Sequence, residues 1–467
     1  MIAMNECRKY LTSGHKGHLI GIGGVSMAPL AEVLLDRGLR LTGSDIHESQ
    51  KILQLRSLGI PVRIGHAATN LDADTEFVVR TAAVHDENPE IAEAHRRGIP
   101  VFERAEAWGA IMQDYRNALC IAGTHGKTTT TSMCTHILMA ADRDPTVMIG
   151  GTLTLLSSEG YRVGKGDTIV LESCEYYNSF LYFYPSIAVI TNIEADHLDF
   201  FKNLKAIQTS FREFAAHVPQ DTGTVIANAD DANTMQALKG LDRRLVTFGM
   251  TDRAEVYPKN IQSVACTSNF DIYFQGSKVT DVTLHVPGTH NIYNALAAAA
   301  ATLNLGVKPS AIKYGLAGFS GANRRFEFKG KYNGADIYDD YAHHPGELKA
   351  LINMVETLHY ERIILVFQPH TYTRTQALFD EFLEQLRRPD IVYLAQIFAA
   401  REKDNHQVSS QMLADRLENA SSFSTFEEIE DILRAAARPG DIILTVGAGD
   451  VYRVGEDLVA KSKTETK

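Results

Sequence analysis

The order of apolar and polar positions along the chain predicts alternating β-strands and α-helices. Short apolar runs precede segments in which apolar residues recur every three or four positions. Three such pairs are residues 18–24 with 28–38, 77–83 with 89–98, and 117–123 with 128–140. The runs are typical of buried strands, and the longer spacing is typical of helices that cover a sheet. Strands and helices in this order build parallel sheets with helices on both faces, so we predict an α/β fold.

The apolar pattern weakens at two places along the chain, residues 110–117 and 318–323, each just before a new strand begins. We therefore predict three domains, residues 1–116, 117–322 and 323–467, and their lengths are ordinary for single α/β domains. The middle domain contains further apolar segments, at 224–231, 244–249 and 269–288. These segments predict extra, partly antiparallel strands beside its parallel sheet.

Composition narrows the class of partner. The chain has 467 residues and a net charge of −11, from 46 Lys and Arg against 57 Asp and Glu. This surplus of negative charge disfavours nucleic acid and anionic membrane surfaces. No segment approaches the ~20 apolar residues that a membrane-spanning helix needs, and the five cysteines lack a paired spacing. We expect a cytoplasmic protein with reduced thiols, no nucleic-acid partner and no membrane insertion, either a monomer or a homodimer.

The segment 121–133, IAGTHGKTTTTSM, places a glycine-rich turn between a predicted strand and a predicted helix. Backbone N–H groups, the helix dipole and the ammonium of Lys127 converge there, which favours a bound phosphate. Thr128 is placed to hold Mg²⁺ with its hydroxyl, although Ile121 stands where a full P-loop has its first glycine. The alternative is a plain turn with a surface lysine. It leaves the hydroxyl-bearing residues 128–132 unexplained, because these are poor helix formers.

Acidic residues follow two other predicted strands. Glu172 and Glu175 end one of them. The segment after the other brings four more candidates, Glu194, Asp196, His197 and Asp199. Carboxylates and imidazole at the carboxyl ends of parallel strands are suited to hold Mg²⁺ beside a triphosphate. Each acid alone is equally typical of a helix cap, but their coincidence with the lysine-bearing turn favours a metal site.

A second glycine cluster lies near the amino end, in HLIGIGGVSM at residues 18–27. Its pattern is G-x-G-G, and Asp45 follows Gly21 by 24 residues, close to the position of the ribose-binding acid of a dinucleotide fold. An NAD site, a different nucleotide site and a tight turn of a doubly wound domain are all compatible with this pattern.

Seven motifs together resemble the Mur ligase family in their order along essentially the whole chain. They are GIGGVSM, GTHGKTTTTSM, NIEADHLD, HNIYNALAA, NRRFE, DDYAHHPGE and FQPHTYTRT. The resemblance implies a Rossmann-like amino-terminal domain for a UDP-sugar, a central P-loop ATPase domain, and a Rossmann-like carboxyl-terminal domain for an amino acid. The first motif and the last two are most similar to the branch that joins L-alanine to UDP-N-acetylmuramate in peptidoglycan precursor synthesis.

The resemblance also implies a reaction and its participants. ATP would phosphorylate the carboxylate of UDP-N-acetylmuramate, and the amine of L-alanine would displace phosphate from the acyl phosphate. Two Mg²⁺ ions and Lys127 would neutralise the charge of an anion attacking an anion.

Site residues carried over from the family fall into four sets. ATP is assigned to Gly123, Thr124, His125, Gly126, Lys127, Thr128, Thr129, Asn291, Arg324 and Asp340. The metal ligands are Thr128, Glu175 and His197, and the catalytic residues are Lys127, Glu175 and His197. The UDP-sugar is assigned to Gly21, Gly23, Gly24, Ser26, Asp45 and His66. The amino acid is assigned to Tyr341, His343, His344 and Arg374.

Some of these assignments have alternatives nearby. Asn294 can take the place of Asn291, and Arg325 that of Arg324. One of the two adjacent histidines of the amino-acid set is expected to be structural. The segment LESCEYYNSF departs from the family pattern EADESDGSF, because Cys174 and two tyrosines replace acids and a serine.

Other functions explain less of the chain. A ligase that recycles a tripeptide onto the same sugar, or one that adds a later residue, is the nearest alternative. An NAD-dependent oxidoreductase accounts only for the glycine cluster and Asp45. A P-loop switch without ligase activity accounts only for the lysine-bearing turn.

Overall fold

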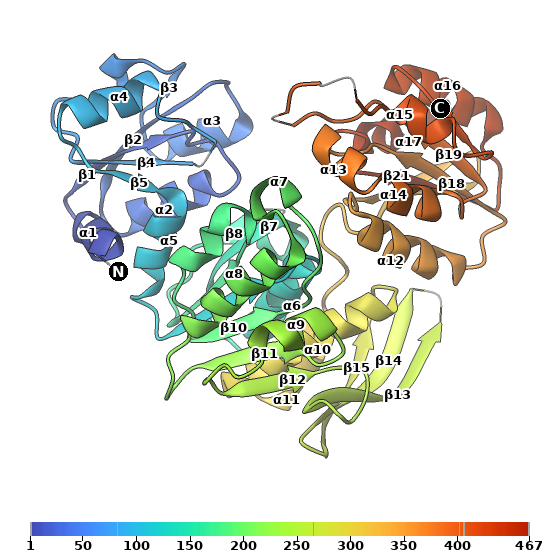
Figure 1. Ribbon diagram of the computed structural model, residues 1–467, viewed down its shortest axis with the longest axis horizontal. Helices are drawn as coiled ribbons and strands as arrows, with labels where there is room; N and C mark the ends of the chain where they lie inside the picture. The colour runs from blue at the N-terminus through green and yellow to red at the C-terminus, as the bar shows by residue number, and fades with distance from the viewer. Residues whose placement is uncertain are drawn as a thin grey trace.

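A computed structural model describes residues 2–81, 83–157, 159–264, 266–400, 402–404 and 407–465. It contains three β-sheets, each flanked by helices, in three bodies that follow one another along the chain (Figure 1). The predicted α/β class with mainly parallel sheets is confirmed. The boundaries proposed at 116/117 and 322/323 stay predictions.

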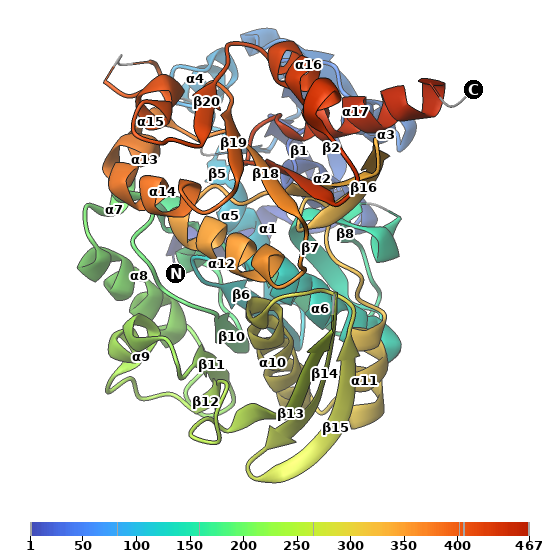
Figure 2. The same cartoon turned by 90° about the vertical axis from the view of Figure 1, so that its right-hand side faces the viewer.

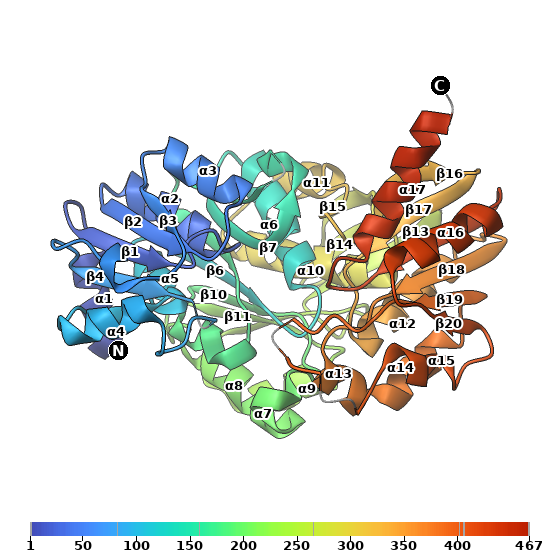
Figure 3. The same ribbon diagram turned by 90° about the horizontal axis from the view of Figure 1, so that it is seen from above.

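The amino-terminal body is built on a parallel five-stranded sheet of order β3-β2-β1-β4-β5. Its strands are β1 (Lys16–Ile20), β2 (Arg40–Asp45), β3 (Val62–Ile64), β4 (Phe77–Arg80) and β5 (Val101–Glu103). Its helices are α1 (Ile2–Tyr10), α2 (Met27–Asp36), α3 (Gln50–Ser57), η1 (Ala68–Asn70), α4 (Pro89–Arg96) and α5 (Arg104–Met112). Seen from above, α3 and α4 lie on opposite sides of the sheet (Figure 3). The strand order reverses at β1, so the turn after β1 lies at the switch point where such sheets bind ligands.

The central body has a ten-stranded sheet of order β15-β14-β13-β12-β11-β10-β6-β9-β7-β8. Its strands are β6 (Asn117–Ala122), β7 (Thr146–Leu153), β8 (Glu159–Arg162), β9 (Thr168–Glu172), β10 (Ile187–Ile190), β11 (Thr224–Asn228), β12 (Leu245–Phe248), β13 (Val256–Val264), β14 (Thr267–Phe274) and β15 (Ser277–Leu284). Its helices are α6 (Lys127–Ala140), η2 (Thr154–Leu156), η3 (Tyr176–Tyr182), α7 (Leu198–Phe201), α8 (Leu204–Ala216), α9 (Ala232–Leu238), α10 (Thr289–Asn304) and α11 (Pro309–Ala317). The predicted antiparallel addition is present as β14 and β15, and β13, which the sequence interpretation did not include, pairs antiparallel with β14.

The carboxyl-terminal body has a six-stranded sheet of order β16-β17-β21-β18-β19-β20, in which only β16 is antiparallel. Its strands are β16 (Glu327–Tyr332), β17 (Ala335–Asp340), β18 (Arg362–Phe367), β19 (Ile391–Leu394), β20 (Ala420–Ser422) and β21 (Asp441–Val446). Its helices are α12 (Pro345–Glu356), α13 (Tyr372–Ala377), α14 (Phe379–Leu386), α15 (Ser410–Ala414), α16 (Phe426–Ala436) and α17 (Tyr452–Glu465). Helix α12 runs between this sheet and the central body (Figure 2).

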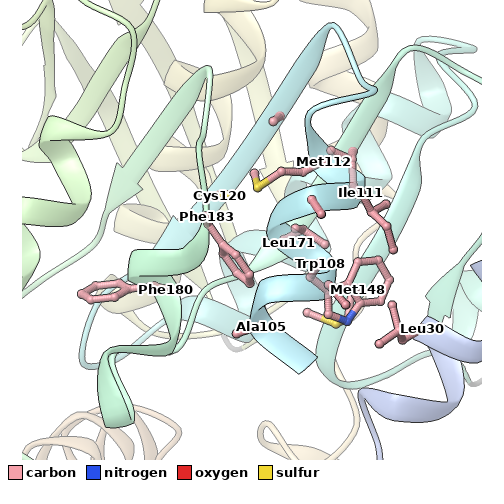
Figure 4. Close-up of a cluster of buried hydrophobic side chains, with 14 of the residues drawn as sticks. Leu30, Ala105, Trp108, Ile111, Met112, Cys120, Met148, Leu171, Phe180 and Phe183 are labelled. Carbon is pink, nitrogen blue, oxygen red and sulfur yellow. The ribbon is translucent and has the colours of Figure 1, made fainter. Parts of the chain in front are cut away.

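One apolar core joins the amino-terminal and central bodies. Trp108 of α5 is fully buried in the same cluster as Met148 and Leu171 of the central sheet (Figure 4). Gly109 allows this close approach, because a Cβ there would overlap the carbonyl oxygen of Tyr182. The carboxyl-terminal body instead has apolar clusters of its own. Within the described ranges, no helix is both long enough and apolar enough to cross a membrane.

Candidate active site

The lysine-bearing turn connects β6 to α6 and depends on two glycines in left-handed backbone geometry. Gly123 has φ +144° and Gly126 has φ +82°. A Cβ at Gly123 would overlap the hydroxyl of Thr191, and a Cβ at Gly126 would lie 2.5 Å from Asn294 Oδ1. The turn therefore packs closely against the end of β10 and against α10. This packing fixes the position of the amino-terminal end of α6.

Lys127 is held at the start of α6 by an acid from a neighbouring strand end. Its Nζ lies 3.1 Å from Glu175 Oε2 and donates to the carbonyl of Thr124, also at 3.1 Å. Burial alone would lower the pKa of Lys127, but the nearby charges, that of Glu175 foremost, raise it above its usual value. The ammonium is therefore charged at neutral pH and is positioned to meet an anion.

The predicted metal ligands lie around the same point. Glu175 Oε1 and His197 Nε2 are 3.9 Å apart, a separation that two ligands of one ion can have. Burial lowers the pKa of His197, which keeps the imidazole neutral and able to ligate. Thr128 donates to Glu172 Oε1 at 3.1 Å, so a second acid joins the set. These hydroxyl, carboxylate and imidazole groups fit a divalent cation; the side chain of Asp199 lies outside the described part of the chain.

The segment that departs from the family pattern has a structural use here. Tyr176 stacks on His197, with ring centroids 4.3 Å apart and an interplanar angle of 21°. Tyr177 packs against Tyr176 on the side of η3. An aromatic stack of this kind fixes the orientation of an imidazole, and such pairs contribute about 0.5–1.5 kcal/mol beyond area burial.

A cavity of about 260 Å³ lies beside the turn, between the central body and α12, and we call it the nucleotide cavity after the predicted ATP set. Its wall includes these residues of the predicted ATP set: His125, Gly126, Thr128, Thr129, Asn291 and Asp340. An adjoining cavity adds Thr124, Lys127 and Arg324. Both asparagine alternatives line the first cavity. They are also bonded to each other, since Asn294 Nδ2 donates to Asn291 Oδ1 at 3.2 Å. The two cavities therefore gather the predicted set apart from Gly123, which lies in the turn and lines neither, and the choice between the two asparagines stays open.

The two adjacent arginines have different surroundings. Arg324 is held within the carboxyl-terminal body by Asp339, at 3.0 Å, and by two backbone carbonyls of the loop after β21. Arg325 lines both cavities, and its Nη1 lies 3.8 Å from Glu347 Oε1. Arg325 is therefore the more available of the two for a nucleotide. Asp340 lines the first cavity, and burial raises its pKa to about 6.

His125 connects the turn to the carboxyl-terminal body. Its Nε2 lies 3.3 Å from Glu194 Oε2, and its Nδ1 lies 3.2 Å from Glu347 Oε1. Burial would lower the pKa of His125, but the two carboxylates raise it to about 9. The imidazolium is an ionic link between the two bodies. The sequence interpretation did not include Glu347, although it is the last residue of the motif DDYAHHPGE. No local pattern indicates that α12 points toward the turn.

A second cavity, of about 620 Å³, contains most of the predicted amino-acid set, and we call it the amino-acid cavity. Tyr341, His343 and Arg374 line it together with His197 and Asp196. Arg374 Nη2 lies 2.9 Å from Asp196 Oδ1, so the guanidinium is already paired across the two bodies. Burial lowers the pKa of His343 to about 4, which leaves the ring neutral.

His344 lies apart from this cavity. It caps α12, where its Nδ1 accepts from Gly346 N at 3.2 Å, and its Nε2 lies 3.3 Å from the carbonyl of Ala195. Of the two adjacent histidines, His343 is the one that faces the amino-acid cavity.

The backbone N–H groups of the amino-terminal glycine turn are already bonded within this body. Gly21 has φ +74°, and Gly23 N donates to Asp45 Oδ2 at 2.8 Å. Gly24 N donates back to the carbonyl of Gly21. His66 Nδ1 lies 3.5 Å from the fully buried carboxylate of Glu90. Ser26 bonds to Arg104 at the start of α5.

Two arginines that the sequence interpretation missed extend this region. Arg80 and Arg104 line a cavity of about 270 Å³ with Tyr177, Ser179 and Tyr182 of the central body. Both arginines stand at the carboxyl ends of parallel strands, β4 and β5. That position is a signal that sequence could have given, because ligands of open α/β sheets bind at those ends.

Three family domains match the chain in succession. They are the Mur ligase family catalytic domain at residues 16–116, the Mur ligase middle domain at 121–302, and the Mur ligase glutamate ligase domain at 324–449. The chain belongs to the Mur ligase family.

The relatives within this family carry the name of one activity. A UDP-N-acetylmuramate–L-alanine ligase of Clostridium novyi is 46% identical over 445 residues, which are 94% of this chain and 96% of that protein. The ligase of the same name from Agathobacter rectalis is 45% identical, over 95% and 97% of the two chains. The crystal structure of UDP-N-acetylmuramate–alanine ligase MurC from Thermotoga maritima has a TM-score of 0.80 at 28% identity and covers 96% of this chain and 99% of that one.

Proposed function

We propose that the chain joins L-alanine to the lactyl carboxylate of UDP-N-acetylmuramate, with ATP converted to ADP and phosphate, in peptidoglycan precursor synthesis. The observation that carries this proposal is the 44–46% identity to ligases of that name over nearly the full chain, across all three domains. The solved MurC structure has the same fold over 96% of the chain.

The arrangement of the cavities supports this reaction. The cavity beside Lys127 and the cavity beside Arg374 share Asp196, His197 and His343 in their walls. A nucleotide and an amino acid bound in them would therefore meet at His197. The reaction needs such a meeting point, because the acyl phosphate made on one side must be attacked by the amine on the other.

Charge neutralisation is the task of the lysine-bearing turn. The negative carboxylate of the sugar attacks a negative triphosphate, so cations must lie where charge develops. Lys127 supplies one, and in the free protein Glu175 compensates its charge. Thr128, Glu175 and His197 would hold two Mg²⁺ ions, whose role is to neutralise phosphate oxygens and orient the phosphoryl group.

The amino-acid side is organised by Arg374. Its Nε and Nη2 both contact Asp196 Oδ1, at 3.1 and 2.9 Å, so the guanidinium plane is fixed. The remaining N–H groups can bind the carboxylate of L-alanine, and His343, neutral at pH 7, lies in the same wall. This pairing orients the amine toward His197.

The sugar nucleotide would lie along the amino-terminal body. The glycine turn at Gly21 and the side chain of Asp45 would meet the nucleotide part, and His66 would lie beside it. Arg80 and Arg104 would meet the diphosphate, because arginine binds phosphate bidentately. ATP is a cytoplasmic substrate, so we place the reaction in the cytoplasm, in a monomer or a homodimer.

Phosphate release tests the proposal. Purified protein is given Mg²⁺, ATP, UDP-N-acetylmuramate and one amino acid at a time. We expect release only with all components, fastest with L-alanine. Glycine and serine should react more slowly, because a small pocket separates such substrates by about 1–3 kcal/mol per methylene. Phosphate release without the sugar nucleotide, or with a tripeptide in preference to alanine, would contradict the proposal.

Arg374→Ala tests the carboxylate clamp separately. It should raise the KM for L-alanine while the KM for ATP stays unchanged, and Arg116→Ala, on an exposed side chain, is the matched control. Unchanged use of alanine by Arg374→Ala would move the clamp to another residue and leave the overall reaction in place.

A further inference from the structure

Three donor atoms converge where the central body meets the amino-terminal end of α12. His125 Nε2 lies 3.3 Å from Glu194 Oε2, and His344 Nδ1 lies 4.0 Å from the same oxygen. All three atoms lie within 4.8 Å of one another. Ligands of a tetrahedral Zn²⁺ with bonds of about 2.0–2.2 Å lie roughly 3.3 Å apart. Small side-chain rotations would therefore bring this set to one ion.

A glycine keeps the space between these donors open. A Cβ at Gly346 would lie 2.8 Å from Glu194 Oε2 and 3.4 Å from both His125 Nε2 and His344 Nδ1. Gly346 stands in the first turn of α12 without a positive φ, so its backbone does not require glycine. Glycine inside a helix is less favourable than alanine by about 1 kcal/mol. Its absent side chain leaves a gap surrounded by two imidazoles and a carboxylate.

The outer nitrogens of the two histidines have different partners. His344 Nε2 lies 3.3 Å from the carbonyl of Ala195, whereas His125 Nδ1 lies 3.2 Å from Glu347 Oε1, an ion-pair distance without hydrogen-bond geometry. Metal-binding histidines usually direct their second nitrogen at a carboxylate or a backbone carbonyl, which fixes the ring and its tautomer. The N–H of Gly346 points at His344 Nδ1, which shows that this nitrogen carries the lone pair.

We propose that His125, Glu194 and His344 form a site for a divalent transition-metal ion, Zn²⁺ by its donor set. Two imidazoles and one carboxylate suit Zn²⁺, whereas Mg²⁺ prefers oxygen ligands throughout. The ion takes the place of the proton between His125 Nε2 and Glu194 Oε2. Gly346 lines the nucleotide cavity, so its freed N–H would be open to solvent there.

The site is distinct from the predicted magnesium site and has its own consequence. His125 and Glu194 belong to the central body, and His344 belongs to the carboxyl-terminal body, so the ion links the two. It also leaves a fourth position toward the nucleotide cavity, which His125 and Glu194 line. Bound Zn²⁺ therefore hinders the opening between the bodies and slows turnover. The effect on turnover rests on the proposed function, whereas the binding does not.

Metal content of the full-length protein tests the binding. Metal-free protein is dialysed against Zn²⁺ with a large excess of Mg²⁺, and bound zinc is measured per chain. We expect one zinc ion that Mg²⁺ does not displace. Gly346→Ala and His344→Ala should each weaken it at least tenfold, and Glu347→Gln by roughly 10- to 100-fold as an outer partner. Alanine favours the helix, so Gly346→Ala keeps α12 intact.

Two controls separate this site from others. His359→Ala removes an exposed histidine of the same body and should keep the zinc. Glu175→Gln removes a predicted magnesium ligand and should also keep it. Zinc that is lost in Glu175→Gln but retained in Gly346→Ala and His344→Ala would overturn the proposal, as would the absence of zinc from wild-type protein. An anomalous-scattering peak between His125, Glu194 and His344 in a zinc-soaked crystal would confirm the position, and a peak elsewhere would contradict it.

A phosphate-release assay then tests the consequence. Zn²⁺ should inhibit the Mg²⁺-supported reaction of the wild type, and Gly346→Ala should need at least tenfold more Zn²⁺ for the same inhibition. Equal sensitivity of both proteins would reject the effect on turnover. A protein without ligase activity would fail this assay and still give the dialysis result, so the two proposals fail separately.

Discussion

The central body meets its two neighbours through interfaces of different chemistry. On the amino-terminal side the contact has a shared apolar core, in which Trp108 is fully buried against the central sheet (Figure 4), and polar contacts such as the Lys51–Glu159 ion pair lie beside it. On the carboxyl-terminal side the contacts include ion pairs, His125 with Glu347 and Arg374 with Asp196. The lysine-bearing turn, both large cavities and the three-donor site adjoin the second interface.

This difference indicates which of the two interfaces holds its bodies together and which can open during turnover. Apolar burial contributes about 25 cal/mol per Å² and needs no particular partner, so it keeps two bodies together throughout a catalytic cycle. A buried ion pair is close to neutral in net stability, because desolvation offsets the attraction. Its charges can instead be satisfied by a substrate. The polar interface is therefore the one expected to open and close around ATP and the amino acid.

The largest effect should come from the apolar interface. Trp108→Ala leaves a cavity between two bodies and should lower the free energy of unfolding by about 3–5 kcal/mol. Denaturant unfolding followed by circular dichroism measures this change. Tryptophan fluorescence cannot be used, because Trp108 is the single tryptophan of the chain. The kcat of the folded fraction should be unchanged. A fall in kcat with normal stability would reverse the comparison.

Lys127→Ala should have the next largest effect, on turnover. It removes a cation from the place where charge develops, and loss of one such electrostatic group costs about 10²- to 10³-fold in kcat, or 2.7–4 kcal/mol. Phosphate release at saturating substrates measures it. Lys205→Ala, on the exposed face of α8, is the matched control. A Lys127→Ala variant with wild-type kcat would contradict the proposed role of Lys127 in the reaction.

The polar interface should make stability depend on pH. The folded-state pKa of His125 is raised to about 9 from 6.5, so its contribution is complete below pH 6.5 and is lost as pH rises through 9. The loss is about 2–3 kcal/mol. Thermal unfolding between pH 6.5 and 9.5 should show a falling Tm in the wild type and a smaller fall in Glu347→Gln. The destabilisation by Trp108→Ala should be the same at both ends of this range.

Arg104→Ala should have the smallest effect and should act on one substrate. Loss of a charged hydrogen bond to phosphate costs about 1.5–3 kcal/mol, or about 10- to 100-fold in the KM for UDP-N-acetylmuramate. The KM for ATP should not change, and Arg116→Ala should leave both constants as they are. Initial-rate kinetics with each substrate varied in turn measures this. An equal rise in both KM values would place Arg104 outside the sugar-nucleotide site.

Much of the fold could be predicted from local pattern, because strands and helices have different apolar periods. The glycine turn with Lys127 was predictable for the same reason, since all its parts are neighbours in the chain. The pairing of Arg374 with Asp196 was not, because it joins residues 178 positions apart through the docking of two bodies. No local signal encodes that distance.

The sequence by itself determined the α/β class, the glycine turn with Lys127 and the order of the family motifs, because each depends on residues close together in the chain. Tertiary structure decided which member of each adjacent pair faces a cavity. Arg324 turns inward to Asp339 while Arg325 faces the nucleotide cavity, and His344 caps α12 while His343 faces the amino-acid cavity. Neighbours on a loop have nearly the same sequence context, so only the groups that surround them in the folded protein can set their directions.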